Sequence, residues 1–324
     1  MINKTIYIIK SLINIMLLSR KIIGIMLLIF SAAMIYAAVG TGIGIIEIQV
    51  TNEPPKILNV TFWQGNTLIN QTSISVADSS GNLNTFTLKV EVEDNNTLTD
   101  IKYIRVVFKT QECSSPDPRC YLNFTYDISA NSIIRSPDHT QFTVSVVNTP
   151  NSALTRGTYE FQLTFPKVAM NLGTYGWSIN VSVEDNSTNS DYKELLNLFD
   201  FAYYAEFELT PKLTIPNARP GTNVTGLTWV NITAINRNST IKIYTNHTYM
   251  LDSSGNNVTN WILENTVTLT IDTVSGSLST TPVSYNITGP SETGNYGVNW
   301  QISVPSGVSS GTYYFYYYVT IEGR

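Results

Sequence analysis

Charged side chains are scarce in this sequence, and they are unevenly placed. Asp, Glu, Lys and Arg make up 13% of the 324 residues, and the formal net charge is -5. Four of the 19 cationic residues precede residue 41, whereas all 24 acidic residues follow it. The chain from Thr41 onward is therefore acidic and lacks the basic surface that nucleic acids bind, so we expect no nucleic-acid partner.

Histidine and catalytic motifs are equally rare. The only histidines are His139 and His247, in "DHTQF" and "NHTYM", which look like exposed turn or strand positions. The sequence contains no G-x-S-x-G, no H-E-x-x-H and no glycine-rich phosphate loop. We predict no catalytic residue, no metal and no cofactor, and a protein that is not an enzyme.

Acidic residues nevertheless gather at two turns. They are Glu91, Glu93, Asp94 and Asp100 at the first, and Glu184, Asp185 and Asp191 at the second. Oxygen-rich turns can hold Ca²⁺, although Leu98 and Asp100 break the EF-hand order here. Paired acids can also serve a glycosidase. Solvated, turn-forming acids are the interpretation we favour, with a Ca²⁺ site as the alternative.

Cysteine occurs only twice, as Cys113 and Cys120 in "ECSSPDPRC". No C-x-x-C or Cys/His spacing indicates a metal site. Two cysteines across a proline-containing loop fit an oxidising compartment, and we predict a disulfide between them. Such a short loop predicts a modest stabilisation, on the order of 2–3 kcal/mol.

One long apolar stretch is present, from Ile22 to Ile46, directly after Arg20-Lys21. Basic residues before it and acidic residues after it place its N-terminus in the cytoplasm. The small residues of "AAVG" (37–40) fit a cleaved signal peptide spanning 1–40, whereas the length of 22–46 fits a retained membrane anchor. The start at Met1 gives a long leader, and Met16 would give a more ordinary one. No second apolar span follows, so we expect the remainder to be exported.

Alternation of apolar and polar residues at period two recurs through the exported part and predicts β-strands. "NTFTLKVEVEDNNTLTDIKYIRVVFK" predicts a β-hairpin, with Leu88, Val90 and Val92 alternating before the turn and Ile104, Val106 and Phe108 after it. Only "DYKELLNLF" tolerates a helix. Many strands without helices favour antiparallel sandwiches.

A weak internal repeat predicts two domains. "RGTYEFQLTFP" (156–166) and "LGTYGWSINVSVED" (172–185) correspond to "TGNYGVNWQISVP" (293–305) and "SGTYYFYYYVTIEG" (310–323). The offsets are 137 and 138, so the last two strands repeat nearly in register. We predict sandwiches over 47–200 and 205–324, separated where Pro211, Pro216 and Pro220 punctuate the chain.

"VTNEPPKILNVTF", "LKVEVEDNNTLTDIKYIRVVF" and "GTYGWSINVSVEDN" together resemble the immunoglobulin-like modules of secreted archaeal and bacterial surface proteins. The ending "ISVPSGVSSGTYYFYYYVTI" is similar to the close of archaeal surface and S-layer-associated proteins. The resemblance covers pieces of both predicted domains. It implies an immunoglobulin-like fold and a cell-surface location rather than an activity.

N-glycosylation sequons are frequent from Thr41 onward. Twelve N-x-S/T sites occur, at Asn59, Asn70, Asn95, Asn123, Asn180, Asn186, Asn223, Asn231, Asn238, Asn246, Asn257 and Asn286. If the cell glycosylates exported proteins, several of these predict glycans on surface loops or outward strand faces.

The alternating stretch from Ile43 to Val50 has two interpretations. Ile46, Ile48 and Val50 share one side of a strand, and Glu47 and Gln49 the other. The stretch is either the first strand of the first domain or an extension that completes the sandwich of a neighbouring copy. Donor-strand archaeal threads and pili resemble the second case, and head-to-tail contacts of that kind make filaments. A pilin-like bundle of 22–46 is a further route.

Six consecutive aromatic residues, Tyr313 to Tyr318, lie near the end of the sequence. Aligned on the repeat, the set Tyr313, Phe315, Tyr317, Val319 and Ile321 matches Tyr175, Trp177, Ile179, Val181 and Val183, and should face the core. The other set, Tyr314, Tyr316 and Tyr318, replaces small and polar residues. These tyrosines either pack across strands or are covered by a partner, a glycan or the adjacent domain.

These features predict an all-β fold, with two tandem immunoglobulin-like antiparallel β-sandwiches after an N-terminal hydrophobic helix. We expect a non-enzymatic, extracellular glycoprotein of the cell envelope, with archaeal character. Its role would be structural or adhesive, as an S-layer-associated protein or a filament subunit joined through residues 43–50. The alternative is an adhesion module that binds a glycan or another cell through surface tyrosines. Expected partners are other copies or envelope proteins, N-linked glycans, and the membrane through 22–46.

Overall fold

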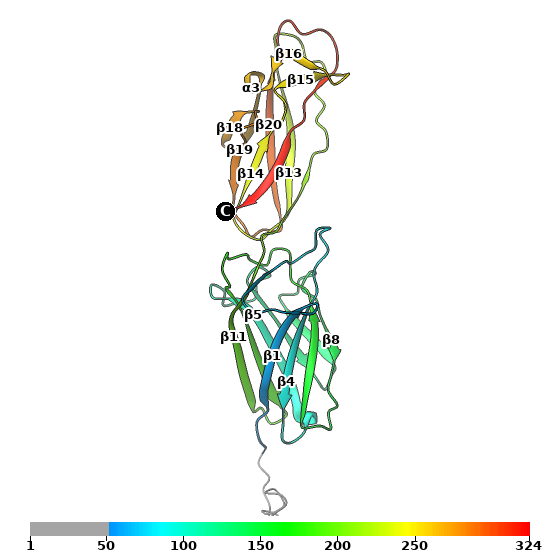
Figure 1. The fold of residues 1–324 in the computed structure, drawn as a ribbon, viewed down its shortest axis with the longest axis vertical. Coiled ribbons are helices and arrows are strands. Elements are labelled where there is room, and N and C mark those ends of the chain that lie inside the picture. Colours follow the sequence, from blue (N-terminus) through cyan, green and yellow to red (C-terminus); the bar gives the residue numbers. More distant parts are fainter. Residues whose placement is uncertain (1–51) are drawn as a thin grey trace, which may run out of the picture. The chain divides into compact units, whose positions relative to one another are not determined.

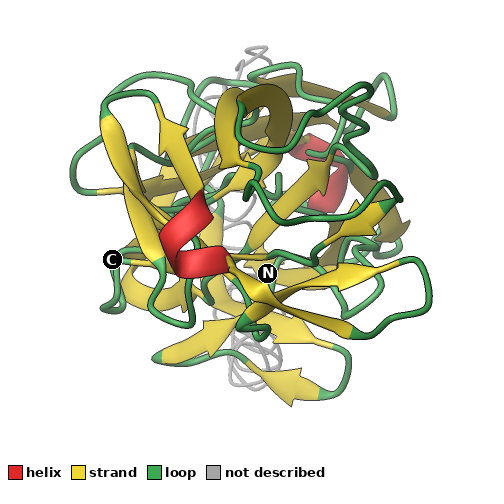
Figure 2. Cartoon of the chain, turned by 90° about the horizontal axis from the view of Figure 1, so that it is seen from above, coloured by secondary structure: helices red, strands yellow, loops and turns green. Residues whose placement is uncertain are grey.

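The computed structural model describes residues 52–324. These residues form strands throughout, with two short helical segments, η2 (Leu98–Asp100) and α3 (Leu263–Thr266) (Figure 2). Within this range neither helix has the length or the apolar composition of a membrane span. The predicted all-β class is confirmed for residues 52–324. The predicted N-terminal hydrophobic helix and the strand at 43–50 lie outside the described residues.

Two sheets form the first sandwich (Figure 1). The five-stranded sheet has the order β2 (Thr67–Leu68), β1 (Lys56–Gln64), β4 (Phe86–Glu93), β9 (Arg156–Leu163), β8 (Val144–Asn148). The six-stranded sheet has the order β3 (Thr72–Ile74), β11 (Ser190–Phe201), β10 (Trp177–Asp185), β5 (Ile101–Thr110), β6 (Tyr121–Asp127), β7 (Ser132–Ser136). Only β3 and β11 pair in parallel, and the other pairs in these two sheets are antiparallel.

This strand order is that of an immunoglobulin-like sandwich of the variable type. Strands β1, β4, β9 and β8 take the places A, B, E and D, and β11, β10, β5, β6 and β7 take the places G, F, C, C′ and C″. Strand β10 is therefore paired along both of its edges, with β5 on one side and β11 on the other. The segment that tolerated a helix, "DYKELLNLF", belongs to strand β11.

The hairpin predicted over 84–109 is wrong, because β4 and β5 lie in opposite sheets. Strand β4 pairs with β1 and β9, whereas β5 pairs with β10 and β6. The predicted inward residues are nevertheless all fully buried: Leu88, Val90, Val92, Ile104, Val106 and Phe108. Two strands joined by a short turn can cross between sheets and bury the same alternate positions, so periodicity does not identify the pairing partner.

Aromatic rings fill the centre of the first core. Phe165, in the segment that follows β9, contacts six other rings, among them Phe201 at 4.9 Å, Phe108 at 5.1 Å and Phe86 at 5.4 Å between ring centroids. All of these rings are essentially inaccessible to solvent. Since each ring buries a large apolar surface, this cluster contributes strongly to the hydrophobic stabilisation of the first sandwich.

The second sandwich contains one five-stranded sheet and two three-stranded sheets. The five-stranded sheet has the order β12 (Ala205–Leu209), β13 (Asn223–Ile235), β20 (Gly294–Ser303), β17 (Val267–Ile271), β18 (Val274–Ser277). The first small sheet is β19 (Val283–Ile287), β14 (Ser239–Tyr244), β22 (Tyr318–Gly323), and the second is β16 (Asn257–Ile262), β15 (Tyr249–Asp252), β21 (Tyr313–Tyr314). A second, separate core lies between the layers.

The repeated sequence segments occupy equivalent places in the two sandwiches. Strand β9 follows β1-β4 in the strand order of its sheet, and β20 follows β12-β13 in the same way. Strand β10 corresponds to the pair β21 and β22. The first strand of the repeat is therefore the E strand of each sandwich, and the second is the F strand.

The aromatic run is not one continuous strand. Tyr313 and Tyr314 form β21 and pair with β15, whereas β22 begins at Tyr318 and pairs with β14. Between them the chain leaves both sheets, and the Thr245 hydroxyl donates a hydrogen bond to the Tyr316 carbonyl at 2.8 Å. The partner strand is interrupted at the same level, between β14 and β15.

Candidate functional site

The free edge of β22 is the main candidate for an interaction site. Among residues 52–324, β22 pairs with β14 and with no other strand. Its counterpart in the first sandwich, β10, has β11 paired along the corresponding edge. The described part of the second sandwich therefore has strands at the A to F places and none at the G place, next to β22 (Figure 1). An unpaired edge presents backbone N–H and C=O groups that another strand can pair with.

The core beneath this edge is incompletely covered. In the first sandwich the inward residues of β10, namely Trp177, Ile179, Val181 and Val183, are all 0% exposed. In the second sandwich the aligned residues Phe315, Tyr317, Val319 and Ile321 pack against the core yet stay partly exposed, as does Tyr313. This is the set that the sequence predicted to face the core. The counterpart of Tyr313 is Tyr175, which was predicted to face the core but is 45% exposed because it lies before β10 begins. An added strand at the G place would bury apolar area that water now reaches.

A second apolar segment of this sandwich, residues 211–216, was not predicted from the sequence. Leu213 and Ile215 pack against the second core, on the space that a Cβ at Gly226 of β13 would need. Their segment, 211–216, comes after β12 in the second sandwich, as β3 comes after β1 and β2 in the first. In the first sandwich β3 pairs in parallel with β11. Segment 211–216 makes no backbone hydrogen bond to any other described residue. The alternation in "KLTIP" was the available sequence signal.

The three tyrosines of the outward set have different surroundings. Tyr314 is half-buried and meets the Tyr316 ring edge-on at 5.6 Å between centroids. Tyr316 is 53% exposed, and Tyr318 is 41% exposed and stacked on Tyr244 at 5.6 Å. Because the strand breaks between β21 and β22, these residues do not form one regular ladder. The other predicted interaction residues, Ile43, Ile46, Ile48 and Val50, lie outside the described residues.

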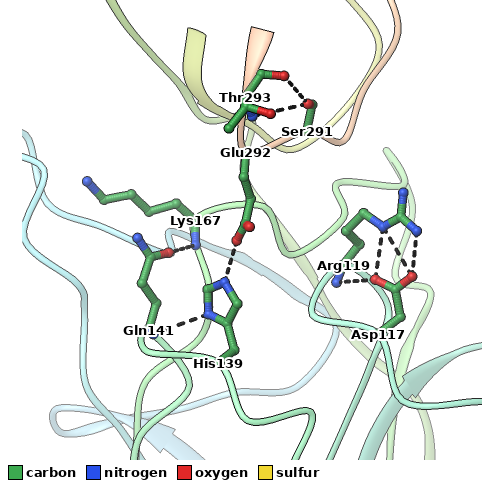
Figure 3. A network of polar contacts seen from close by, with 8 residues as sticks. All are labelled: Asp117, Arg119, His139, Gln141, Lys167, Ser291, Glu292 and Thr293. Carbon is green, nitrogen blue, oxygen red and sulfur yellow. Dashed lines mark hydrogen bonds and ion pairs between the residues drawn. The ribbon is translucent and has the colours of Figure 1, made fainter.

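Polar contacts join loops of the first sandwich to the second (Figure 3). His139 pairs with Glu292, and its Nδ1 accepts a hydrogen bond from the backbone N–H of Gln141 at 3.2 Å. Because Nδ1 accepts this bond, Nε2 is the N–H group that donates a hydrogen bond to the Glu292 carboxylate. The Lys167 ammonium pairs with Glu206 at 2.7 Å. The sequence indicated an exposed position for His139, yet its side chain is only 15% exposed because Glu292 lies against it.

The predicted acidic turns bring Asp94, Asp100 and Asp185 into electrostatic contact. Asp94 is 1% exposed, and its Oδ1 accepts a hydrogen bond from the Asn96 N–H at 2.7 Å. Within residues 52–324 no three His, Cys, Asp or Glu side chains are arranged to hold a metal ion. Burial raises the pKa of Asp94, and the neighbouring carboxylates raise it further. The pKa of Asp200 is also raised by burial, against hydrogen bonds from backbone N–H groups.

These raised pKa values predict that the first sandwich is more stable in mild acid. A raised carboxyl pKa favours the folded state fully below the ordinary value, about 4, and this advantage is lost as pH rises through the folded pKa. We expect Asp94→Asn to raise the Tm at pH 7 by a few degrees and to flatten the dependence of Tm on pH above about 4. Thermal denaturation at pH 4 to 8 measures both effects.

A matched control for this prediction is Asp127→Asn. The pKa of Asp127 is lowered by a hydrogen bond from the Ala130 N–H and another from Ser129. Its contribution has the opposite sign: it is present above the ordinary value and lost as pH falls through the lowered pKa. The Asp127 variant should therefore not gain Tm at pH 7. A gain as large as that of Asp94→Asn would contradict the assignment to burial.

The predicted modification sites are mostly on the surface. Ten of the twelve sequon asparagines are exposed, and Asn123 and Asn180 are half-buried on strands of the six-stranded sheet. Cys113 and Cys120 are joined by a disulfide, with their Cα atoms 5.9 Å apart.

Comparison of this chain with known proteins gives no functional assignment. No protein-family model matches the chain, and no curated protein matches it. Among solved structures, the CupB6 tip adhesin from Pseudomonas aeruginosa is similar over 82% of this chain and 95% of its own chain. The identity is 9% and the TM-score is 0.28. Values this low carry no argument about function, which has to come from the residues of the chain itself.

Proposed function

We propose that this protein is a non-enzymatic subunit of an extracellular filament, assembled by donor-strand exchange at the free edge of β22. The observation that carries the proposal is that no strand of residues 52–324 lies at the place beside β22, where β10 of the first sandwich has β11. A strand inserted there would pair with the backbone of β22 and cover partly exposed residues such as Phe315 and Val319. The resemblance to surface-protein modules is consistent with this role.

We propose residues 43–50 of a second copy as the inserted strand. Their apolar side (Ile46, Ile48 and Val50) suits the incompletely covered core, and Glu47 and Gln49 would face water. Eight extended residues span about 26 Å, which is longer than the six residues of β22. Donation from one copy to the next is a head-to-tail contact, and such contacts propagate into filaments instead of closing.

Cross-linking between copies tests this pairing by its register. The two native cysteines are bonded to each other, so any cross-link between chains comes from the introduced cysteines. A chain with Gln49→Cys is mixed with chains that carry single cysteines at 318 to 322, during assembly. We expect cross-links to Tyr318, Thr320 and Glu322 positions, which share the outward side, and few or none to Val319 and Ile321.

Electron microscopy of the same preparations provides the second measurement. Deletion of residues 43–50 should abolish filaments, whereas deletion of residues 2–9 should leave them intact. Filaments that persist without residues 43–50, or cross-links without alternation, would contradict donor-strand exchange. Cross-links confined to one chain would indicate that each copy occupies its own edge.

A second candidate function is an adhesion module for glycans or cells. The observation that favours it is the exposure of Tyr316 and Tyr318, at 53% and 41%, on the outward side of the run. Aromatic rings with a wet face can stack on sugars. Loss of glycan-array binding in Tyr316→Ser and Tyr318→Ser, with filaments unchanged, would support this role instead.

A further inference from the structure

An exposed tryptophan lies on the outer face of the five-stranded sheet, away from the second core. Along β13 the residues Val230 and Ile232 point into the core, and the alternate residues Leu227, Trp229 and Asn231 point outward. Leu227 and Trp229 are each 42% exposed. A large apolar side chain that is this exposed beside a second one suggests a contact surface rather than an isolated residue.

One face of the Trp229 ring is supported by a glycine. Gly297 of β20 lies directly opposite Trp229 in the sheet. A Cβ placed on Gly297 would come within 3.2 Å of the Trp229 ring and 3.3 Å of the Leu227 methyl group. The ring therefore rests on bare backbone, as glycine in a strand allows. Trp229 is nevertheless 42% exposed, so the ring offers solvent a flat apolar platform.

Amide groups surround this platform. Asn231 lies opposite Asn295, and Leu227 lies opposite Asn299, so amides stand at the diagonal positions around Trp229. The indole N–H of Trp229 has no hydrogen-bond partner among residues 52–324, whereas that of Trp300 donates to Thr228 at 2.8 Å. An apolar ring with free polar groups at its margin matches a sugar, which has an apolar C–H face and hydroxyls around its edge.

Asn231 is itself the asparagine of a sequon, Asn231-Ile232-Thr233. It is exposed, and it lies two residues after Trp229 on the same side of an extended strand, about 6.6 Å away along the chain. We propose that Trp229, seated on Gly297, is the docking platform for the N-linked glycan at Asn231. The proposal rests on the glycoprotein character expected from the sequence and is independent of the edge at β22, which belongs to another sheet.

Other sequons supply a matched control. Asn223 also lies on β13, and the residue two positions before it is Gly221, which offers no ring. Thr233→Val removes the Asn231 sequon and keeps the shape of the side chain. The Thr233 hydroxyl has no hydrogen-bond partner within the described residues, so this change should not unfold the protein. Thr225→Val removes the Asn223 sequon in the same way.

The test uses the full chain purified from its native glycosylating host, and it begins with the mass of the peptide that contains Asn231. Oxidation of Trp229 is then followed by peptide mass spectrometry, which separates it from the buried Trp177, Trp261 and Trp300. We expect Thr233→Val to raise the oxidation rate of Trp229 several-fold, and Thr225→Val to leave it unchanged. Trp229→Ala should lower Tm by about 2–4 °C more in the glycosylated chain than in the Thr233→Val background.

Two results would overturn the proposal. One is an unmodified Asn231 in the native protein, and the other is equal oxidation of Trp229 with and without the sequon. Protection that persists in Thr233→Val and rises with protein concentration would assign the platform to a neighbouring copy instead. Filament formation in Thr233→Val is scored separately, because loss of this glycan should leave donor-strand exchange intact.

Discussion

A peptide with the sequence of residues 41–52 should bind a chain that consists of residues 53–324 and stabilise its second sandwich. Residues 53–324 form one compact unit, so this chain retains both cores. The peptide would bury the partly exposed side of Tyr313, Phe315 and Val319 and pair with the backbone of β22. A ligand at 100 times its Kd adds about 2.7 kcal/mol, which predicts a rise of roughly 5–10 °C in Tm. Calorimetry over a peptide titration measures the shift.

The control peptide carries Ile46→Asn, Ile48→Asn and Val50→Asn. It keeps the backbone groups that pair with β22 but loses the apolar side, so most of the shift should disappear. A shift of equal size with both peptides would mean that the partly exposed core plays no part. Absence of a shift with the native peptide at any concentration would remove the basis for donor-strand exchange at this edge.

Phe165→Ala should produce the largest loss of stability among single substitutions in the first sandwich. The ring contacts six other buried rings, so its removal leaves a cavity that the surrounding rings cannot fill. Substitutions of this kind lower the free energy of unfolding by about 3–5 kcal/mol. Trp177, 6.3 Å from Phe165, reports the transition by fluorescence during urea denaturation.

The matched control is Tyr175→Ala. Tyr175 is 45% exposed and lies just before β10, so its removal should change the free energy of unfolding by about 0.5 kcal/mol or less. A similar loss in the two variants would show that the aromatic cluster does not dominate the stability of the first sandwich.

Short-range patterns in the sequence predicted the buried residues well. Leu88, Val90 and Val92 were predicted inward from alternation alone, and each is 0% exposed. Period two reports which side of a strand is apolar, and that side has to be buried wherever the strand pairs. The same property explains the failed hairpin. Strands β4 and β5 show the expected alternation, but they pair with β1 and β9 and with β6 and β10, respectively, and β9 and β10 come more than 60 positions later.

The aligned repeat shows which properties follow from the local sequence and which depend on tertiary contacts. The sequence alone determined that Tyr313, Phe315 and Tyr317 share a side with Val319 and Ile321, because alternation is a local property of the chain. Only the tertiary structure decided that these residues remain partly exposed, while their counterparts Trp177 and Ile179 are fully buried. Burial depends on a neighbouring strand, and neighbours are brought together by long-range pairing. The free edge of β22 and the ring of Trp229 on Gly297 are consequences of that pairing.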